Sequence, residues 1–95
     1  MRITFEPGAR DDLERIYAWL FDDNPQAVAA TLSRIEAKLN RLANPKLAHM
    51  GRIGLVEGTR ELIESPYIIV YTVHESACEI VVVSVVHGAR QRNRT

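Results

Sequence analysis

Two apolar stripes with helical spacing, separated by Asn24-Pro25, constrain this chain more than any other feature of its sequence. From Ala9 to Leu20 apolar residues recur at i, i+4, i+7, i+8 and i+11, and from Val28 to Leu42 they recur at i, i+4, i+7, i+11 and i+14. Asn-Pro suits a helix cap followed by a first helical residue. Because this connection is so short, the stripes predict an antiparallel helix hairpin whose apolar faces share one partner.

That partner is predicted to be a sheet formed by the second half of the chain. Residues 67–73 and 79–86 are rich in β-branched and aromatic residues, 56–64 are compatible with a third strand, and 74–77 are typical of a hairpin loop. No helix-length segment separates these strands, which predicts an antiparallel meander. The near-continuous apolar run 80–86 predicts a central strand covered on both faces.

The remaining segments complete one domain. Residues 2–6 alternate between apolar and polar side chains, as a short half-buried strand does, and Gly51-Arg52-Ile53-Gly54 is interpreted as a flexible turn. A chain of 95 residues is expected to form one core. We therefore predict a single α+β domain over residues 1–95: a short N-terminal strand, an antiparallel helix hairpin, and a three-stranded antiparallel meander packed on the helices.

Composition excludes several classes of function. The formal net charge is zero and the pI about 6.8, so bulk electrostatics predicts no attraction to a membrane and no direct sequence-specific DNA binding by the chain alone. No segment approaches the roughly 18 apolar residues of a membrane span. The lone Cys78 has no partner for an intramolecular disulfide. We expect a cytoplasmic protein.

The charges are nevertheless distributed unevenly. Acidic residues such as Asp11 and Asp12 lie early in the first predicted helix, where they oppose the partial positive charge of its N-terminus. The segment 87–95 carries three arginines and no acid. Two interpretations of this basic tail remain open, a solvated chain end or a surface for an acidic partner. Its arginines are Arg90, Arg92 and Arg94.

The sequence contains few candidates for catalytic or metal-binding residues. His87 ends the last predicted strand just before Gly88, a position that suits an exposed functional group, although the sequence alone favours a histidine that only caps the sheet with a satisfied hydrogen bond. No serine lies in a GxSxG context. No His, Cys, Asp or Glu pair has the HxxxH or CxxC spacing of a metal site, so no metal or other cofactor is expected.

Arg60 is the other candidate, because a charged head within a strand must reach solvent, a carboxylate or a phosphate. Adjacent strand residues point to opposite faces, so Arg60 is not expected to pair with Glu61. We expect it to meet Glu6, an acidic side chain of a helix, or an acidic partner. A structural ion pair and a binding role both remain open.

The order of these elements, together with three segments, resembles the RelE/ParE superfamily of bacterial toxins. The segments are GTREL at 58–62, PYIIVY at 66–71 and VHGAR at 86–90. The resemblance implies a small α+β toxin that arrests growth and a ParD-like antitoxin whose C-terminal segment wraps around it. That segment would lay an apolar helix face on the helix hairpin and could add a strand to an open sheet edge. The residues implied in antitoxin binding are Leu13, Tyr17, Leu20, Leu32 and Arg60.

The superfamily has two branches that need different residues. Ribonuclease members, similar to RelE, cut messenger RNA on the ribosome and use arginines to stabilise charge on the scissile phosphate while the 2′-hydroxyl attacks. Their arginine after the tyrosine of the penultimate strand is replaced here by Ile68, and no aromatic residue follows Arg90. A substitute set would have to consist of His87, Arg60 and Arg90.

The sequences of the GTREL and HGAR segments are closer to those of the ParE branch, whose members are described as poisons of DNA gyrase that act by binding. This resemblance implies no catalytic residue. An inactive relative that only binds an antitoxin is a further alternative, but the sequence favours the ParE branch. The residues then implied in target binding are Arg60, His87, Arg90, Arg92 and Arg94.

Overall fold

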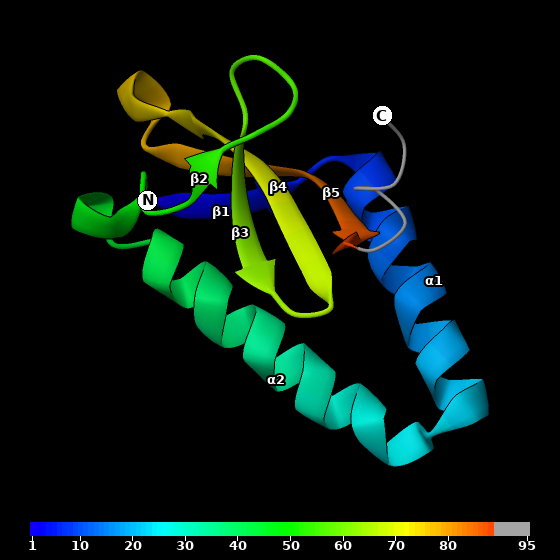
Figure 1. Ribbon diagram of the computed structural model, residues 1–95. Helices are drawn as coiled ribbons and strands as arrows, with labels where there is room; N and C mark the ends of the chain where they lie inside the picture. Colours follow the sequence, from blue (N-terminus) through cyan, green and yellow to red (C-terminus); the bar gives the residue numbers. More distant parts are fainter. Residues whose placement is uncertain (89–95) are drawn as a thin grey trace.

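The computed structural model describes residues 1–88 of the 95-residue chain. Within these residues, helices α1 and α2 and a five-stranded sheet form the architecture (Figure 1). The elements in chain order are β1 (Arg2–Phe5), α1 (Pro7–Asp23), α2 (Pro25–Leu42), the 3-10 turn η1 (Pro45–Leu47), β2 (Arg52–Ile53), β3 (Arg60–Glu64), β4 (Tyr67–His74), the 3-10 turn η2 (Glu75–Ala77) and β5 (Glu79–His87). The α+β class and both helices are as predicted.

The sheet is mixed, with the strand order β1-β5-β4-β3-β2. Strands β3, β4 and β5 form the predicted antiparallel meander. However, β1 pairs in parallel with β5, with Arg2 opposite Glu79 and Phe5 opposite Val82. The predicted meander is confirmed, but the prediction did not include the parallel addition of β1, which makes the sheet mixed. A parallel pair needs a long crossover, and the chain from α1 to β4 supplies one that the local pattern of the last three strands does not reveal.

The segment Gly51–Gly54 is also different from the prediction. It contains the short strand β2, in which Arg52 lies opposite Glu61 and Ile53 opposite Arg60. A strand of this length has too few residues to show an alternating pattern. The interpretation of this segment as a flexible turn was therefore wrong.

The strand predicted over 56–64 begins only at Arg60. Before it, the Thr59 amide donates to the Val56 carbonyl at 3.1 Å, and Gly58 has a φ of +85°. This bond and this φ are those of a turn with glycine at its third position, where other residues are strained. The turn keeps residues 56–59 out of the ladder.

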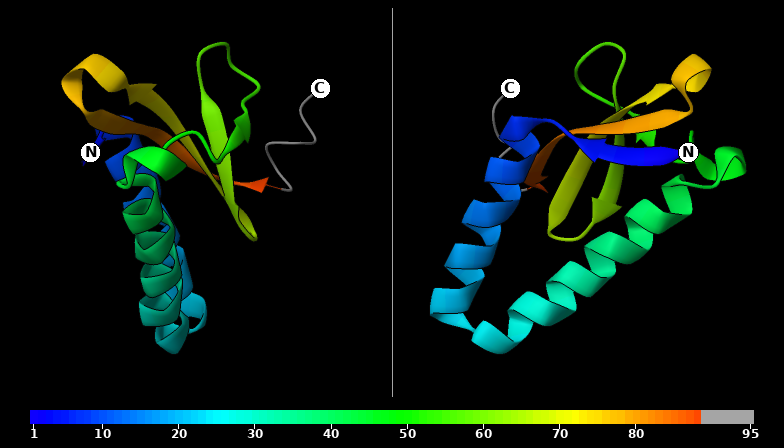
Figure 2. Two further views of the ribbon diagram at one scale, coloured as in Figure 1. Left: turned by 90° about the vertical axis from the view of Figure 1, so that its left-hand side faces the viewer. Right: turned by 180° about the vertical axis from the view of Figure 1, so that it is seen from behind.

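Both helices lie on one face of the sheet (Figure 2). They meet at Asn24 and diverge as a V, with α1 packed along β5 and α2 in contact with β3. As predicted, β5 is an inner strand, but Ile80, Val82 and Val85 are buried while Val81 and Val86 are only half-buried. The prediction that both of its faces are covered was wrong, because its β-branched run reflects strand propensity rather than two-sided burial.

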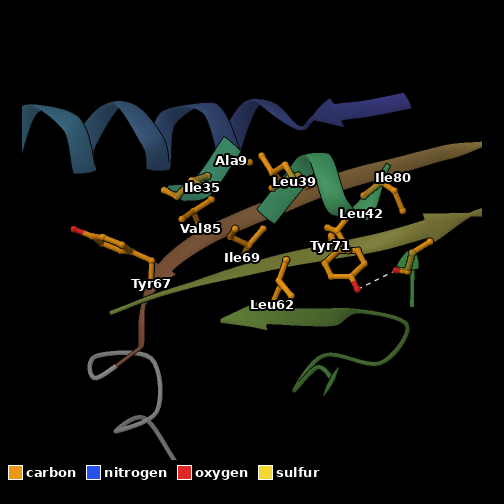
Figure 3. Close-up of a cluster of buried hydrophobic side chains, with 12 residues drawn as sticks. Ala9, Ile35, Leu39, Leu42, Leu62, Tyr67, Ile69, Tyr71, Ile80 and Val85 are labelled. Carbon is orange, nitrogen blue, oxygen red and sulfur yellow. Dashed lines mark hydrogen bonds between the residues drawn. The ribbon is translucent and has the colours of Figure 1, made fainter. Parts of the chain in front are cut away.

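The apolar stripes of both helices meet the sheet in one core (Figure 3). Burial of each large aliphatic side chain there stabilises the fold by about 1.5–3 kcal/mol. The core side chains include Ala9, Ile35, Leu39 and Leu42 from the helices and Leu62, Tyr67, Ile69, Tyr71, Ile80, Val82 and Val85 from the strands.

Tyr71 at the centre of β4 is fully buried and holds the chain between α2 and β2. Its hydroxyl donates to the Ala48 carbonyl at 3.0 Å (Figure 3) and accepts from the Gly51 amide at 3.0 Å. A Cβ at Gly51 would lie 2.6 Å from this hydroxyl, so only glycine allows the approach. Burial raises the pKa of Tyr71, and the hydroxyl stays protonated to donate.

We expect Tyr71→Phe to lower the free energy of unfolding by about 1–3 kcal/mol, because it leaves two buried backbone groups without their partner. Tyr17→Phe is the matched control, since among residues 1–88 the Tyr17 hydroxyl is buried without a hydrogen-bond partner. Its unfolding free energy should change little. Urea denaturation of the wild type and the two variants measures these free energies of unfolding. An equal decrease in Tyr71→Phe and Tyr17→Phe would contradict this role of Tyr71.

Candidate functional site

A groove lies between α1 and the C-terminal half of β5. β1 ends opposite Val82, where the Glu6 amide donates to the Val82 carbonyl at 3.0 Å, and β5 continues beyond its neighbour. There the Val85 amide donates to Asp12 Oδ2 of α1 at 3.0 Å. Arg15 forms an ion pair with the other oxygen of Asp12. The helix thereby covers an edge amide that a strand would otherwise pair.

The role of Asp12 differs from the sequence interpretation. Because α1 begins at Pro7, Asp11 and Asp12 lie beyond its first turn, where the field of the helix terminus has largely faded. The Asp12 carboxylate instead accepts a hydrogen bond from the Val85 amide of β5. The sequence held no signal for this contact, because it depends on where α1 meets the strand.

The groove has a volume of about 640 Å³. Its floor is apolar, with Ile16, Val85 and Val86, and its rim carries the Asp12–Arg15 pair. A concave surface with a few polar groups at its rim suits a side chain or a short segment of another protein. The complete lining is Asp12, Arg15, Ile16, Ala18, Trp19, Val85, Val86 and His87.

His87 lies at the end of β5, at one end of this groove. Its ring meets Tyr67 edge-on, with the ring centroids 5.9 Å apart and the planes at 83°. Its Nδ1 is buried and has no hydrogen-bond partner among residues 1–88. The histidine is thus packed against the sheet on one side and borders the groove on the other.

Arg60 is held by backbone groups rather than by an acid. Its Nη1 donates to the Gly51 carbonyl at 2.8 Å and to the His49 carbonyl at 3.1 Å. The expected contact with Glu6 or with a helix acid was therefore wrong, because the β2 segment, which the sequence did not reveal, lies beside Arg60. Glu61 does point to the other face, as expected, and pairs with Arg52 at 3.2 Å.

The candidate ribonuclease set is not brought together in the described part of the chain. Arg60 pairs with Tyr71, and His87 pairs with Tyr67 on the other side of β4. They are therefore separated by four residues along the sheet, about 13 Å, and by two strand spacings, about 10 Å, across it. The third member, Arg90, lies outside the described residues, as do Arg92 and Arg94.

The helix residues implied in antitoxin binding differ in exposure. Leu13 packs against the core, and Tyr17 and Leu20 are half-buried. Burial raises the pKa of the Tyr17 hydroxyl, and the nearby Glu36 carboxylate adds to the effect. Leu32 on α2 is 36% exposed. The apolar stripe of α1 is thus partly buried against the sheet and only partly available to a partner.

Two aromatic residues that the sequence analysis passed over are much more exposed. Trp19 is 61% and Phe21 63% exposed, both near the end of α1. They flank the apolar stripe that ends at Leu20. The sequence does contain a signal for them, because large aromatic residues stand at helix positions outside the apolar stripe, where polar residues are usual.

A second, smaller pocket of about 300 Å³ lies at the other end of the sheet. Arg60 and His49 supply its polar groups, and Ile53 and Val73 its apolar wall. His49 Nε2 lies 2.7 Å from Glu75 Oε1, which joins η2 to the segment after η1. Beside this pocket, the loop between β2 and β3 exposes several aliphatic side chains.

Residues 1–88 contain no group of three or more His, Cys, Asp and Glu side chains arranged to hold a metal ion. Within the same residues, neither helix is long and apolar enough to cross a bilayer.

A family model described as "ParE toxin of type II toxin-antitoxin system, parDE" matches residues 3–92. The chain belongs to this family of toxins. A curated relative, "Putative toxin Y4kP" of Sinorhizobium fredii, is 32% identical over 92 residues, which cover 95% of this chain and 91% of the relative. The ParE branch that the sequence favoured is thereby confirmed.

Solved structures show the same fold. A chain of the chromosomal ParDE system from P. aeruginosa has a TM-score of 0.77 at 22% identity and covers 92% of this chain and 95% of its own. A chain of the RelBE2 toxin–antitoxin complex from Mycobacterium tuberculosis has a TM-score of 0.61, also at 22% identity, with 90% and 95% covered. This ParE chain thus has the RelE/ParE fold.

We expect Asp12→Ala to speed hydrogen exchange of the Val85 amide about tenfold or more, because that N–H loses its carboxylate acceptor. Asp12→Asn, which keeps an acceptor oxygen, should retain part of the protection. Asp11→Ala removes an exposed acid from the neighbouring position and is the control. Exchange followed by NMR decides the point, and equal Val85 rates in the wild type and Asp12→Ala would contradict the contact.

Proposed function

We propose that this ParE-family chain arrests growth in the cytoplasm by binding and inhibiting DNA gyrase, and that a cognate ParD-like antitoxin neutralises it. The observation that carries the proposal is the match to the ParE toxin family over residues 3–92. The resemblance to ParE members implies action by binding rather than by catalysis. The separation of Arg60 from His87 supports this, because a phosphate between them could not contact both side chains.

The antitoxin surface is proposed on the helix side of the molecule. Leu13, Tyr17, Leu20 and Leu32 supply apolar area beside the groove along β5. Trp19 is added to this surface, because a large exposed aromatic residue at the rim of a groove is a typical anchor for a partner helix. The open end of β5 offers a place for an added strand if the partner displaces Asp12 from Val85.

Target binding is proposed to use basic residues. His87 borders the groove, and Arg60 lines the smaller pocket, where it also contributes to antitoxin binding. Arg90, Arg92 and Arg94 concentrate positive charge near the end of a chain whose net charge is zero. Such a cluster steers association with an acidic protein surface and weakens as salt is raised.

We expect the purified protein to abolish supercoiling of relaxed plasmid by gyrase and to cause linear DNA to accumulate, because a bound toxin would hold the enzyme on cleaved DNA. Added antitoxin should reverse both effects. The chain shortened after Gly88 is the control for the tail and should inhibit less while still binding antitoxin. Gyrase that remains active at micromolar concentrations of a toxin that still arrests growth would contradict the proposal and favour cleavage of messenger RNA on the ribosome.

Trp19→Ala tests the helix surface. We expect about tenfold or weaker antitoxin binding by calorimetry, because an exposed aromatic anchor is lost without a change in the core. Glu14→Ala, an exposed position on the same helix, is the control and should bind as the wild type does. Unchanged affinity of Trp19→Ala would remove Trp19 from the proposed surface.

A further inference from the structure

The end of β2 and the loop between β2 and β3 together expose three aliphatic side chains. Ile53 is 82% exposed, and Leu55 and Val56 are each 67% exposed. In all views the loop projects from the end of the sheet opposite the junction of α1 and α2 (Figures 1 and 2). Soluble proteins rarely expose adjoining large aliphatic residues without a partner. We call Ile53, Leu55 and Val56 the apolar tip.

The backbone of the apolar tip is held in one conformation by polar groups. The Gly54 amide donates to the Thr59 carbonyl at 2.9 Å, and the Thr59 hydroxyl donates to the Val56 carbonyl at 2.6 Å. A Cβ at Gly54 would lie 2.2 Å from that hydroxyl, so a larger residue cannot replace it without movement. The turn at Gly58 closes the loop. Such a loop is ordered before it meets a partner.

A buried carboxylate fixes the base of the same loop. Glu61 is 5% exposed, and its Oε2 accepts from the Leu55 amide at 3.2 Å while Oε1 pairs with Arg52 at 3.2 Å. Burial of a charge is costly unless it is paired and hydrogen-bonded. Here that carboxylate orders a segment whose side chains contribute little to the core. The arrangement stabilises a presented surface rather than the interior.

We propose that the apolar tip is the surface through which this toxin inserts into an apolar pocket of its protein target. The inference rests on the proposed function, because it assigns the contact between the toxin and the molecule that it inhibits. An ordered loop loses little conformational entropy on binding.

The chemistry of the tip favours a protein pocket over a nucleic acid. Nucleic-acid surfaces are recognised by cations on phosphates and by aromatic rings stacked on bases, whereas aliphatic side chains offer neither. Arg52 is already paired with Glu61, Arg60 opposite Ile53 donates to two backbone carbonyls, and Glu57 adds a negative charge to the loop. A concave apolar site with a polar rim matches these features.

The arrangement of the surfaces also argues against a second copy of the chain as the occupant. The larger groove is lined by residues of α1 and the end of β5, which are elements separate from the loop, so a tip in the groove of another copy would form a head-to-tail contact. Such contacts either close into a ring or propagate into filaments. Leu55 and Val56 also lie away from the helix part of the proposed antitoxin surface, and only Ile53 shares the smaller pocket with Arg60. Since the chain measures only 41 × 31 × 21 Å, a bound antitoxin can still exclude a large target sterically.

The test replaces Leu55 and Val56 together with serine, because both are mostly exposed and their loss should leave folding intact. We expect the variant to need about tenfold or more protein for half-maximal inhibition of gyrase and to lose growth arrest, while its antitoxin affinity stays that of the wild type. Leu55→Ile with Val56→Ile should restore inhibition. Ile63→Thr is the control, because Ile63 is an exposed aliphatic residue on β3 away from the tip.

Each other outcome overturns the inference. Inhibition by the serine variant at wild-type concentrations would show that the tip does not contact gyrase. Loss of antitoxin binding together with toxicity would place the tip in the antitoxin surface or in the fold. Self-association of the wild type that the serine variant abolishes in sedimentation would assign the tip to a second copy.

The proposed function and this inference fail separately. If the wild type arrests growth but leaves gyrase active, the gyrase proposal is wrong. Whether the serine variant still arrests growth then tests the role of the tip. Continued arrest by that variant would overturn the inference, and loss of arrest would support it for the other target. A wild type that does not arrest growth has no target, which overturns both.

Discussion

The parallel pairing of β1 with β5 is the constraint on which the rest of the structure depends. It places Ile3 beside Ile80 and Phe5 beside Val82, at opposite ends of the chain, so the segment that leads from β1 to the other strands must cross the sheet on one face. The two helices therefore cover that face as a V, and the other face stays without helices. Because β1 is shorter than β5, the end of β5 has a strand partner only on its β4 side, and that end becomes one wall of the larger groove.

How much of this could be predicted from sequence depends on the range of each interaction. Helices α1 and α2 and the β4–β5 hairpin follow from local spacing and turn residues, and they were predicted almost to the residue. The parallel partner of β1, the two-residue strand β2 and the contact of Asp12 with Val85 join segments that are far apart or too short to carry a period. The same limit explains why the partners of Arg60 were not predicted, because the carbonyl groups that it contacts belong to the segment around β2. Trp19 was not predicted for a different reason, because a periodic pattern identifies the buried positions of a helix and not which exposed positions bind a partner.

The polar networks of the molecule divide between two tasks. The Tyr71 hydroxyl links two backbone groups of the segment between η1 and β2 and stabilises the interior. The Glu61 carboxylate and the Thr59 hydroxyl order a projecting loop that buries little of its own surface. The helix side, with Trp19 and the groove, is suited to a long partner segment, and the tip is suited to a compact pocket. The proposed function requires contacts with two partners, and the helix side and the tip would supply them from different elements of the fold.

The most direct test of this division is hydrogen exchange, followed by mass spectrometry, of the toxin alone, with its antitoxin and with gyrase. The account predicts that antitoxin slows exchange in peptides of α1, α2 and the end of β5, with little change over residues 53–59. Gyrase should slow exchange over residues 53–59. Protection of residues 53–59 by the antitoxin, or protection of the helices alone by gyrase, would contradict the assignment of two separate surfaces.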